Sequence, residues 1–198
     1  LMVWRGGQGR MTTTPPHDIT DRGIGSYLPA GDGSTFLLDL MERSKKILSD
    51  HSVNRWREKN GKRKATSIWL WGQGKAPDFP SLKERFGLSG GVISAVDLIN
   101  GLGVYAGLER VSVPGVTGFF DTNYKGKAEY GLEALKDKDL IFIHVEAPDE
   151  AGHMGDAVEK VKAIESFDEL VVGTVLKGMD RWEDWRILLL PDHPTPVV

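Results

Sequence analysis

Residues 140–153 read Leu-Ile-Phe-Ile-His-Val-Glu-Ala-Pro-Asp-Glu-Ala-Gly-His, an apolar run followed directly by acidic residues and a histidine. Leu140 to Val145 predicts a short buried strand, and residues 187–190 predict another, which leads into Asp192 and His193. In open α/β sheets, ligands bind outside the carboxyl ends of the strands. The two Asp/His pairs therefore predict a site at one edge of a sheet.

Apolar strands alternate with helices along the rest of the chain. We predict strands near residues 66–71, 91–93, 111–113, 140–145 and 187–190, and helices near 34–50, 81–86, 95–100, 124–135 and 155–177. This alternation is typical of an α/β fold in which a mostly parallel sheet has helices on both faces.

The composition divides the chain near residue 64. Residues 1–35 are rich in Gly, Pro, Thr and Asp and predict loops, and residues 54–64 are charged. Residues 1–66 carry 12 Lys and Arg against 7 Asp and Glu, whereas the remainder carries 13 against 21. A basic segment beside an acidic body suits a phosphorylated substrate, and it equally suits a solvated linker. We expect two regions, residues 1–64 and 65–198.

Several classes of protein do not fit this composition. The 198 residues are 40% hydrophobic and 27% charged, as in globular proteins, and no apolar stretch is long enough to span a bilayer, so we expect no membrane association. The chain has no cysteine, which excludes thiolate metal sites and fits a cytoplasmic location. The six tryptophans lie in no basic stripe, so we expect no nucleic-acid partner. Both ends of the sequence lead us to expect a fragment of a longer protein.

The first pair, Asp149 and His153, has i, i+4 spacing, which places both side chains on one face of a helix. The second pair, Asp192 and His193, enters a proline-containing loop that can aim both side chains at one cavity. Carboxylate and imidazole together suit Mn²⁺ or Zn²⁺, and additional carboxylates suit Mg²⁺. Aspartates at strand ends are also typical turn residues, and single histidines are commonly structural. We interpret His144 as a hydrogen-bonded core histidine and Glu146 as a possible partner of the ligands.

Ten motifs together resemble the archaeal-type cofactor-independent phosphoglycerate mutases of the alkaline phosphatase superfamily. They span nearly the whole chain: Thr14-Pro-Pro-His-Asp-Ile19, Ile68-Trp-Leu-Trp-Gly72, Val92-Ile-Ser-Ala-Val-Asp97, Val113-Pro-Gly-Val-Thr-Gly118, Asp121-Thr122, residues 144–153, Gly155-Asp156, Lys162-Ala-Ile-Glu165, Asp168 and Leu190-Pro-Asp-His-Pro-Thr-Pro196.

The resemblance implies a two-metal phosphoryl transferase that interconverts 3-phosphoglycerate and 2-phosphoglycerate, a step of glycolysis, through a phosphoserine and without bisphosphoglycerate. The first pair would bind one Mn²⁺ or Mg²⁺ (or Zn²⁺), and the second pair the other. The family's nucleophilic serine and a further Asp ligand would precede this chain, and a further His ligand would follow it. We therefore expect no catalytic residue in this chain, which alone would be inactive. Its core would be an incomplete alkaline-phosphatase-like α/β core, and residues 1–64 would be the end of an inserted cap domain and the return linker.

The substrate, a small phosphorylated molecule, needs cationic contacts for its phosphate and carboxylate. Arg5, His17, Asp18 and Arg22 are our candidates, although exposed surface arginines also fit the sequence at positions 5 and 22. Two other functions stay open: another phosphotransferase or phosphatase of the superfamily, including the homoserine-kinase-like members, or a non-catalytic domain. The sequence leaves the oligomeric state open.

Overall fold

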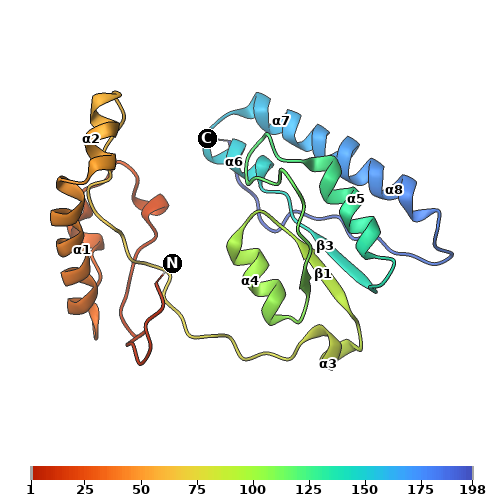
Figure 1. Cartoon of the computed structure of the whole chain (residues 1–198), viewed down its shortest axis with the longest axis horizontal. Helices are drawn as coiled ribbons and strands as arrows, with labels where there is room; N and C mark the ends of the chain where they lie inside the picture. Colours follow the sequence, from red (N-terminus) through yellow and green to blue (C-terminus); the bar gives the residue numbers. More distant parts are fainter. Residues whose placement is uncertain (1, 198) are drawn as a thin grey trace. The chain divides into compact units, whose positions relative to one another are not determined.

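The computed structural model describes residues 2–197, which form two compact units, Leu1–Ala76 and Pro77–Val198 (Figure 1). The first unit therefore includes the segment that follows residue 64, where the change of composition is. The assignment of residues 1–64 to a cap domain stays a prediction. Each unit is described by itself below.

The first unit is built on two helices, with irregular chain packed against them. Its elements are the 3₁₀ helices η1 (Pro16–Ile19) and η2 (Ile24–Tyr27) and the α-helices α1 (Ser34–Ser49) and α2 (Ser52–Lys59). Helix α1 confirms the helix predicted over 34–50. Helix α2 was not predicted because its sequence is charged and its apolar side chains are few. It begins where the His51 Nδ1 atom accepts a hydrogen bond from the Val53 amide at 3.2 Å.

The strand predicted over residues 66–71 is wrong. Within residues 2–197 the segment pairs with no strand. Side chains of the first unit accept hydrogen bonds from its backbone amides instead. The Asn54 Oδ1 atom accepts from the Ala65 amide at 2.9 Å, and the Ser44 hydroxyl accepts from the Ile68 amide at 3.0 Å. The Trp69 indole donates to the Thr14 carbonyl at 2.7 Å. The apolar run therefore belongs to a strap along α1 and not to a sheet.

The second unit contains a parallel sheet, as the sequence predicted, and its strand order is β2-β1-β3. Its strands are β1 (Gly90–Ile93), β2 (Glu109–Arg110) and β3 (Leu140–Ile143). Strand β2 forms two residues earlier than the strand predicted over 111–113, although the Val111 amide still donates to the Val92 carbonyl at 2.9 Å.

The second unit contains the helices predicted near 81–86, 124–135 and 155–177, a longer helix than predicted after β1, and α6, which was not among the predicted helices. The helices are α3 (Leu82–Phe86), α4 (Asp97–Tyr105), α5 (Tyr124–Ala134), α6 (Ala147–His153), α7 (Ala157–Ser166), the π-helical segment η3 (Phe167–Val172) and α8 (Gly173–Met179). The helix predicted over 155–177 is thus present but interrupted by π-helical turns. It begins where the Asp156 carboxylate caps the Glu159 amide at 2.9 Å. None of the helices described is long and apolar enough to cross a membrane.

Helices cover both faces of the sheet, which confirms the predicted class (Figure 1). A Cβ at Gly103 of α4 would lie 2.5 Å from the Val92 side chain, so α4 packs closely on the face that Val92 presents. Ile143 packs on the other side, against a core that includes Tyr124 and Ala128 of α5. Val92 pairs with Phe142, the neighbour of Ile143, and successive residues of a strand point to opposite faces. Hence α4 and α5 lie on opposite faces.

The strand predicted over residues 187–190 is also wrong. The segment is extended and strongly apolar, yet it pairs with no strand in the part of the chain that the structure describes, and Leu188 is 85% exposed. An apolar run becomes a strand only beside a neighbour that accepts and donates its backbone hydrogen bonds, and sequence composition does not supply that neighbour.

Lys127 lies fully buried in the core beneath the carboxyl end of β3. Its Nζ atom donates to the His144 carbonyl at 2.9 Å, and burial lowers the pKa of Lys127 to about 8, partly opposed by the negative charge of Glu146. Lysines are rarely buried completely, because the charged form loses its hydration. Lys127 thus ties α5 to the segment that connects β3 with α6.

Replacement of Asn54 by Ala should destabilise the first unit by about 2–3 kcal/mol. The buried Asn54 amide donates to the carbonyls of Leu48 and Ala65, both at 2.7 Å, and all these partners would lose their bonds. The matched control is Asn60→Ala, because Asn60 is exposed and its side-chain amide donates one hydrogen bond, to the Trp56 carbonyl. Urea unfolding followed by tryptophan fluorescence measures both, and equal losses in the two variants would contradict this account.

The stability of the wild-type chain should rise with pH between about 8 and 10.5 relative to Lys127→Met. The pKa of Lys127 is lower in the folded than in the unfolded chain, so across this window the unfolded chain binds more protons. The difference should grow by at most about 1.4 kcal/mol per pH unit. Urea unfolding of both proteins from pH 7.5 to 9.5 measures it. Parallel pH profiles would show that Lys127 has an ordinary pKa.

Candidate metal centre

Helix α6 carries the first pair. A short connection, residues 144–146, joins β3 to this helix. Pro148 lies in the first turn of α6, where backbone amides have no partner within the helix, so proline costs no hydrogen bond there. The Asp149 Oδ2 and His153 Nε2 atoms lie 3.3 Å apart, one helical turn from each other. The i, i+4 spacing therefore places both side chains on one face, as predicted, and directly after a strand of the sheet.

The second pair reaches the first pair from a loop. The His193 Nε2 atom lies 4.0 Å from Asp149 Oδ1 and 3.8 Å from Asp192 Oδ2. The His193 Nδ1 atom lies 3.2 Å from the Pro194 carbonyl, and this bond, followed by the charge of Asp192, raises the pKa of His193. The structure thus brings the two pairs together at Asp149. It does so without the second strand end that the sequence suggested.

Glu146 and Glu150 add two carboxylates beside Asp149, and we call these residues and the two pairs the cluster. Glu146, Asp149 and Glu150 each offer an oxygen atom, and these atoms lie within 4.8 Å of one another. Burial raises the pKa of Glu146, and the neighbouring charges of Asp149 and Glu150 raise it further. Neither glutamate was among the predicted ligands, although their i, i+3 and i+4 spacing was visible in the sequence. Repulsion among these carboxylates decreases when a cation lies between them.

His144 is a hydrogen-bonded and largely buried histidine, as predicted, and it also contacts Glu146. Its Nδ1 atom lies 3.2 Å from the Ser94 hydroxyl, and its Nε2 atom lies 3.4 Å from Glu146 Oε2. Burial lowers the pKa of His144. Ser94 follows β1 and His144 follows β3, so this contact joins the carboxyl ends of two neighbouring strands and fixes the direction of Glu146.

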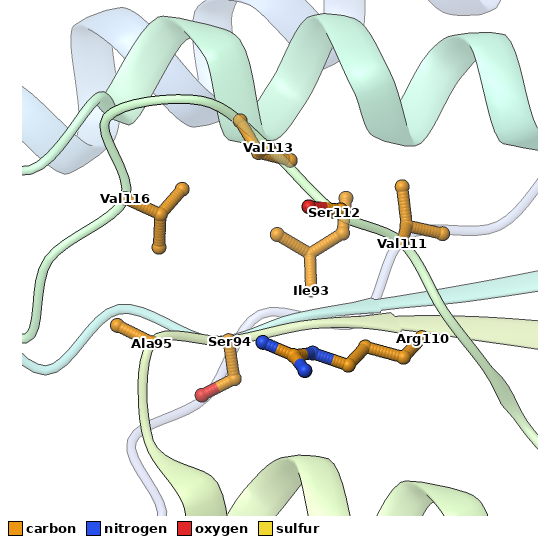
Figure 2. Close-up of a pocket in the computed structure, with 8 residues that line it drawn as sticks. All are labelled: Ile93, Ser94, Ala95, Arg110, Val111, Ser112, Val113 and Val116. Carbon is orange, nitrogen blue, oxygen red and sulfur yellow. The ribbon is translucent and has the colours of Figure 1, made fainter.

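A small pocket lies beside the ends of β1 and β2. Figure 2 shows the residues that line it, Ile93, Ser94, Ala95, Arg110, Val111, Ser112, Val113 and Val116. Its volume is about 130 Å³, below the range of about 300–1,000 Å³ that is usual for ligand pockets. The lining includes neither the first pair nor the second pair. The metal candidates instead lie on open surface, where Asp149 is the least exposed of the four, at 24%.

The predicted substrate residues belong to the first unit. His17 and Asp18 lie together in η1, with His17 Nε2 3.8 Å from Asp18 Oδ1, and the His17 ring lies edge-on to Trp71 at 5.3 Å. Arg5 and Arg22 are exposed, like His17 and Asp18. Within residues 2–197, no ion pair or hydrogen bond joins either arginine side chain to His17 or Asp18. Their role in substrate binding stays a prediction.

The donor atoms of the cluster fit a divalent metal. The His153 Nε2 atom lies 3.3 Å from an Asp149 oxygen, and the His193 Nε2 atom lies 4.0 Å from the other Asp149 oxygen and 3.8 Å from an Asp192 oxygen. Imidazole nitrogen together with carboxylate oxygen is the mixture of donors that Mn²⁺ and Zn²⁺ prefer. Asp149 lies near both histidines and is therefore the residue at which the first pair and the second pair meet.

Curated relatives match nearly the whole chain. This chain is 53% identical over 197 residues to a Geobacter sulfurreducens protein named "Probable 2,3-bisphosphoglycerate-independent phosphoglycerate mutase". The match covers 100% of this chain and 49% of the relative. The chain is 55% identical over 185 residues to the 2,3-bisphosphoglycerate-independent phosphoglycerate mutase of Methanothrix thermoacetophila, covering 93% of this chain and 47% of the relative. The chain thus spans about half the length of the curated relatives it matches.

A solved structure and a family profile agree with these matches. The structure of the PH0037 protein from Pyrococcus horikoshii superimposes with a TM-score of 0.62 and 29% identity, covering 73% of this chain and 38% of that one. Residues 16–198 match the profile of the metalloenzyme superfamily. Since this match covers most of the sequence, the chain belongs to the metalloenzyme superfamily, whose members bind divalent metal.

Proposed function

We propose that the full-length protein containing this chain interconverts 3-phosphoglycerate and 2-phosphoglycerate without bisphosphoglycerate. The observation that carries the proposal is the meeting of the two pairs at Asp149, with His153 Nε2 at 3.3 Å and His193 Nε2 at 4.0 Å. The names of the relatives support the choice of substrate.

In this proposal Asp149 and His153 hold one Mn²⁺ or Mg²⁺, and Asp192 and His193 hold a second. Bound divalent ions stabilise the charge of a transferring phosphoryl group and lower the pKa of an attacking hydroxyl. Asp149 holds one oxygen toward each histidine, and His144 orients Glu146 beside the cluster. The nucleophilic serine, which carries the phosphoryl group, comes from outside these 198 residues, so the chain alone is inactive.

The first unit supplies substrate contacts in the same proposal. Residues 1–64 are the end of a cap domain, and Arg5, His17, Asp18 and Arg22 contact the substrate, with the two arginines at its anionic groups. All four side chains are exposed and therefore accessible, and this part of the chain has an excess of basic residues. A small phosphorylated substrate and the absence of cysteine agree with a location in the cytoplasm.

His153→Ala and His193→Ala should each lower kcat/KM of the full-length protein more than about 100-fold, since even indirect partners of a metal contribute 10–100-fold. His51→Ala is the matched control, because His51 is an exposed histidine of the first unit that only caps α2. The assay follows 2-phosphoglycerate formed from 3-phosphoglycerate with Mn²⁺. Undiminished activity in either site variant would remove the assigned roles, and release of inorganic phosphate without 2-phosphoglycerate would indicate a phosphatase.

Chelation should abolish the activity of the full-length protein, and added Mn²⁺ should restore it, because the ions carry the charge stabilisation. The 198-residue chain should show no turnover with Mn²⁺ under the same conditions. A full-length protein that stays active after exhaustive chelation would contradict the metal requirement. Turnover by the isolated chain would contradict the assignment of the nucleophile to another part of the protein.

A further inference from the structure

The loop that carries the second pair needs an anchor. The preceding residues 187–190 pair with no strand among those described, and both Asp192 and His193 are exposed. Their own contacts are local, since the His193 amide donates to Asp192 Oδ1 at 3.0 Å and its ring contacts the Pro194 carbonyl. The 4.0 Å approach of His193 to Asp149 must therefore depend on another residue of the loop.

Thr195 makes the contacts that hold this loop to the helices. The Thr195 hydroxyl donates to Asp149 Oδ1. The hydroxyl oxygen of Thr195 also lies 3.3 Å from His193 Nδ1. The backbone carbonyl of Thr195 accepts a hydrogen bond from the Lys160 Nζ atom of α7. One residue thus touches a member of each pair and is tied to α7 through its main chain.

The surface of α6 leaves room for Thr195 because residue 152 is a glycine. A Cβ at Gly152 would lie 2.6 Å from the Thr195 carbonyl oxygen and 2.8 Å from its methyl group. Real Cβ atoms do not approach other atoms so closely, and the first obstacle is backbone. Any side chain at position 152 would push the loop away from α6.

We propose that Thr195 is the positioning residue of the metal centre: it holds the loop of Asp192 and His193 against Asp149, in a seat that Gly152 leaves open. The inference rests on the proposed metal site, which supplies its functional meaning. Thr195 acts through its neighbours. Its hydroxyl occupies Asp149 Oδ1, which leaves Oδ2 directed at His153, and its position sets the distance between the pairs.

The test compares Thr195→Val with Thr195→Ser in the 198-residue chain. Valine keeps the shape of threonine and removes the hydroxyl, whereas serine keeps the hydroxyl. In the metal-free protein, ¹⁵N relaxation of the backbone amides of Asp192, His193 and residue 195 should show an ordered loop in the wild type and in Thr195→Ser. In Thr195→Val the same amides should be mobile, with an order parameter below about 0.6. Mn²⁺ titrated calorimetrically should bind about 10–100-fold more weakly to Thr195→Val, with recovery in Thr195→Ser.

Gly152→Ala tests the seat without touching Thr195. Alanine is a better helix former than glycine, so α6 itself should not lose stability, yet the loop should become mobile and Mn²⁺ binding should weaken about as much as in Thr195→Val. The matched control is Gly101→Ala in α4, where a Cβ meets no atom within 4 Å. This control should leave the loop order and the Mn²⁺ affinity unchanged.

Wild-type loop order and affinity in Thr195→Val would overturn the inference, whatever the Mn²⁺ affinity of the wild type. Equal loss in Thr195→Ser and Thr195→Val would also overturn it, because the hydroxyl would then not be the cause. Mn²⁺ binding too weak to detect in the wild-type chain would reflect the metal ligands that the proposed function places outside these 198 residues. In that case the relaxation data alone decide whether Thr195 holds the loop.

Discussion

The contact between Asp149 and the loop of residues 192–195 is the constraint on which the site depends. The first pair is local, because one turn of α6 brings Asp149 and His153 within 3.3 Å. The second pair is distant in sequence and reaches Asp149 only where the loop lies on α6. Without this contact the chain would present two separate Asp/His pairs, each of them an ordinary surface feature.

The sheet places α6, the helix that carries Asp149, at the carboxyl end of β3. Parallel strands β1 and β3 end next to each other, and the following segments meet where Ser94 contacts His144. Buried Lys127 holds the His144 carbonyl, and His144 in turn contacts Glu146 at the start of α6. Helices on opposite faces of a sheet open a crevice at the strand ends, which is where ligands bind in such folds. The direction of α6, and with it the direction of Asp149, follows from these contacts.

The sequence predicted the features that depend on local pattern. The strand at 140–143, the helices at 34–49 and 124–134 and the shared face of Asp149 and His153 follow from periodicity and spacing. The segments at 66–71 and 187–190 are also rich in apolar residues, yet neither has a neighbouring strand in the described chain. Pairing is a property of distant residues, so composition could not decide it.

The site itself was only half visible for the same reason. The sequence linked the two pairs through two predicted strand ends, of which the structure contains only the first, and through the resemblance to a family. Nothing in the spacing of residues 149 and 192 requires their approach. Thr195 has neither a carboxylate nor an imidazole, and Gly152 has no side chain. The sequence alone therefore gives no reason to assign either residue to a metal site. Their role appears only when the loop is seen against α6.

The most direct measurement of the central claim is anomalous diffraction at the manganese edge from crystals grown with Mn²⁺. The account predicts anomalous density within coordination distance of Asp149 and His153, together with density at Asp192 and His193 in the same cluster. Manganese bound at only one pair, with the loop of residues 192–195 displaced from α6, would contradict the account, because the two pairs would then not form one centre.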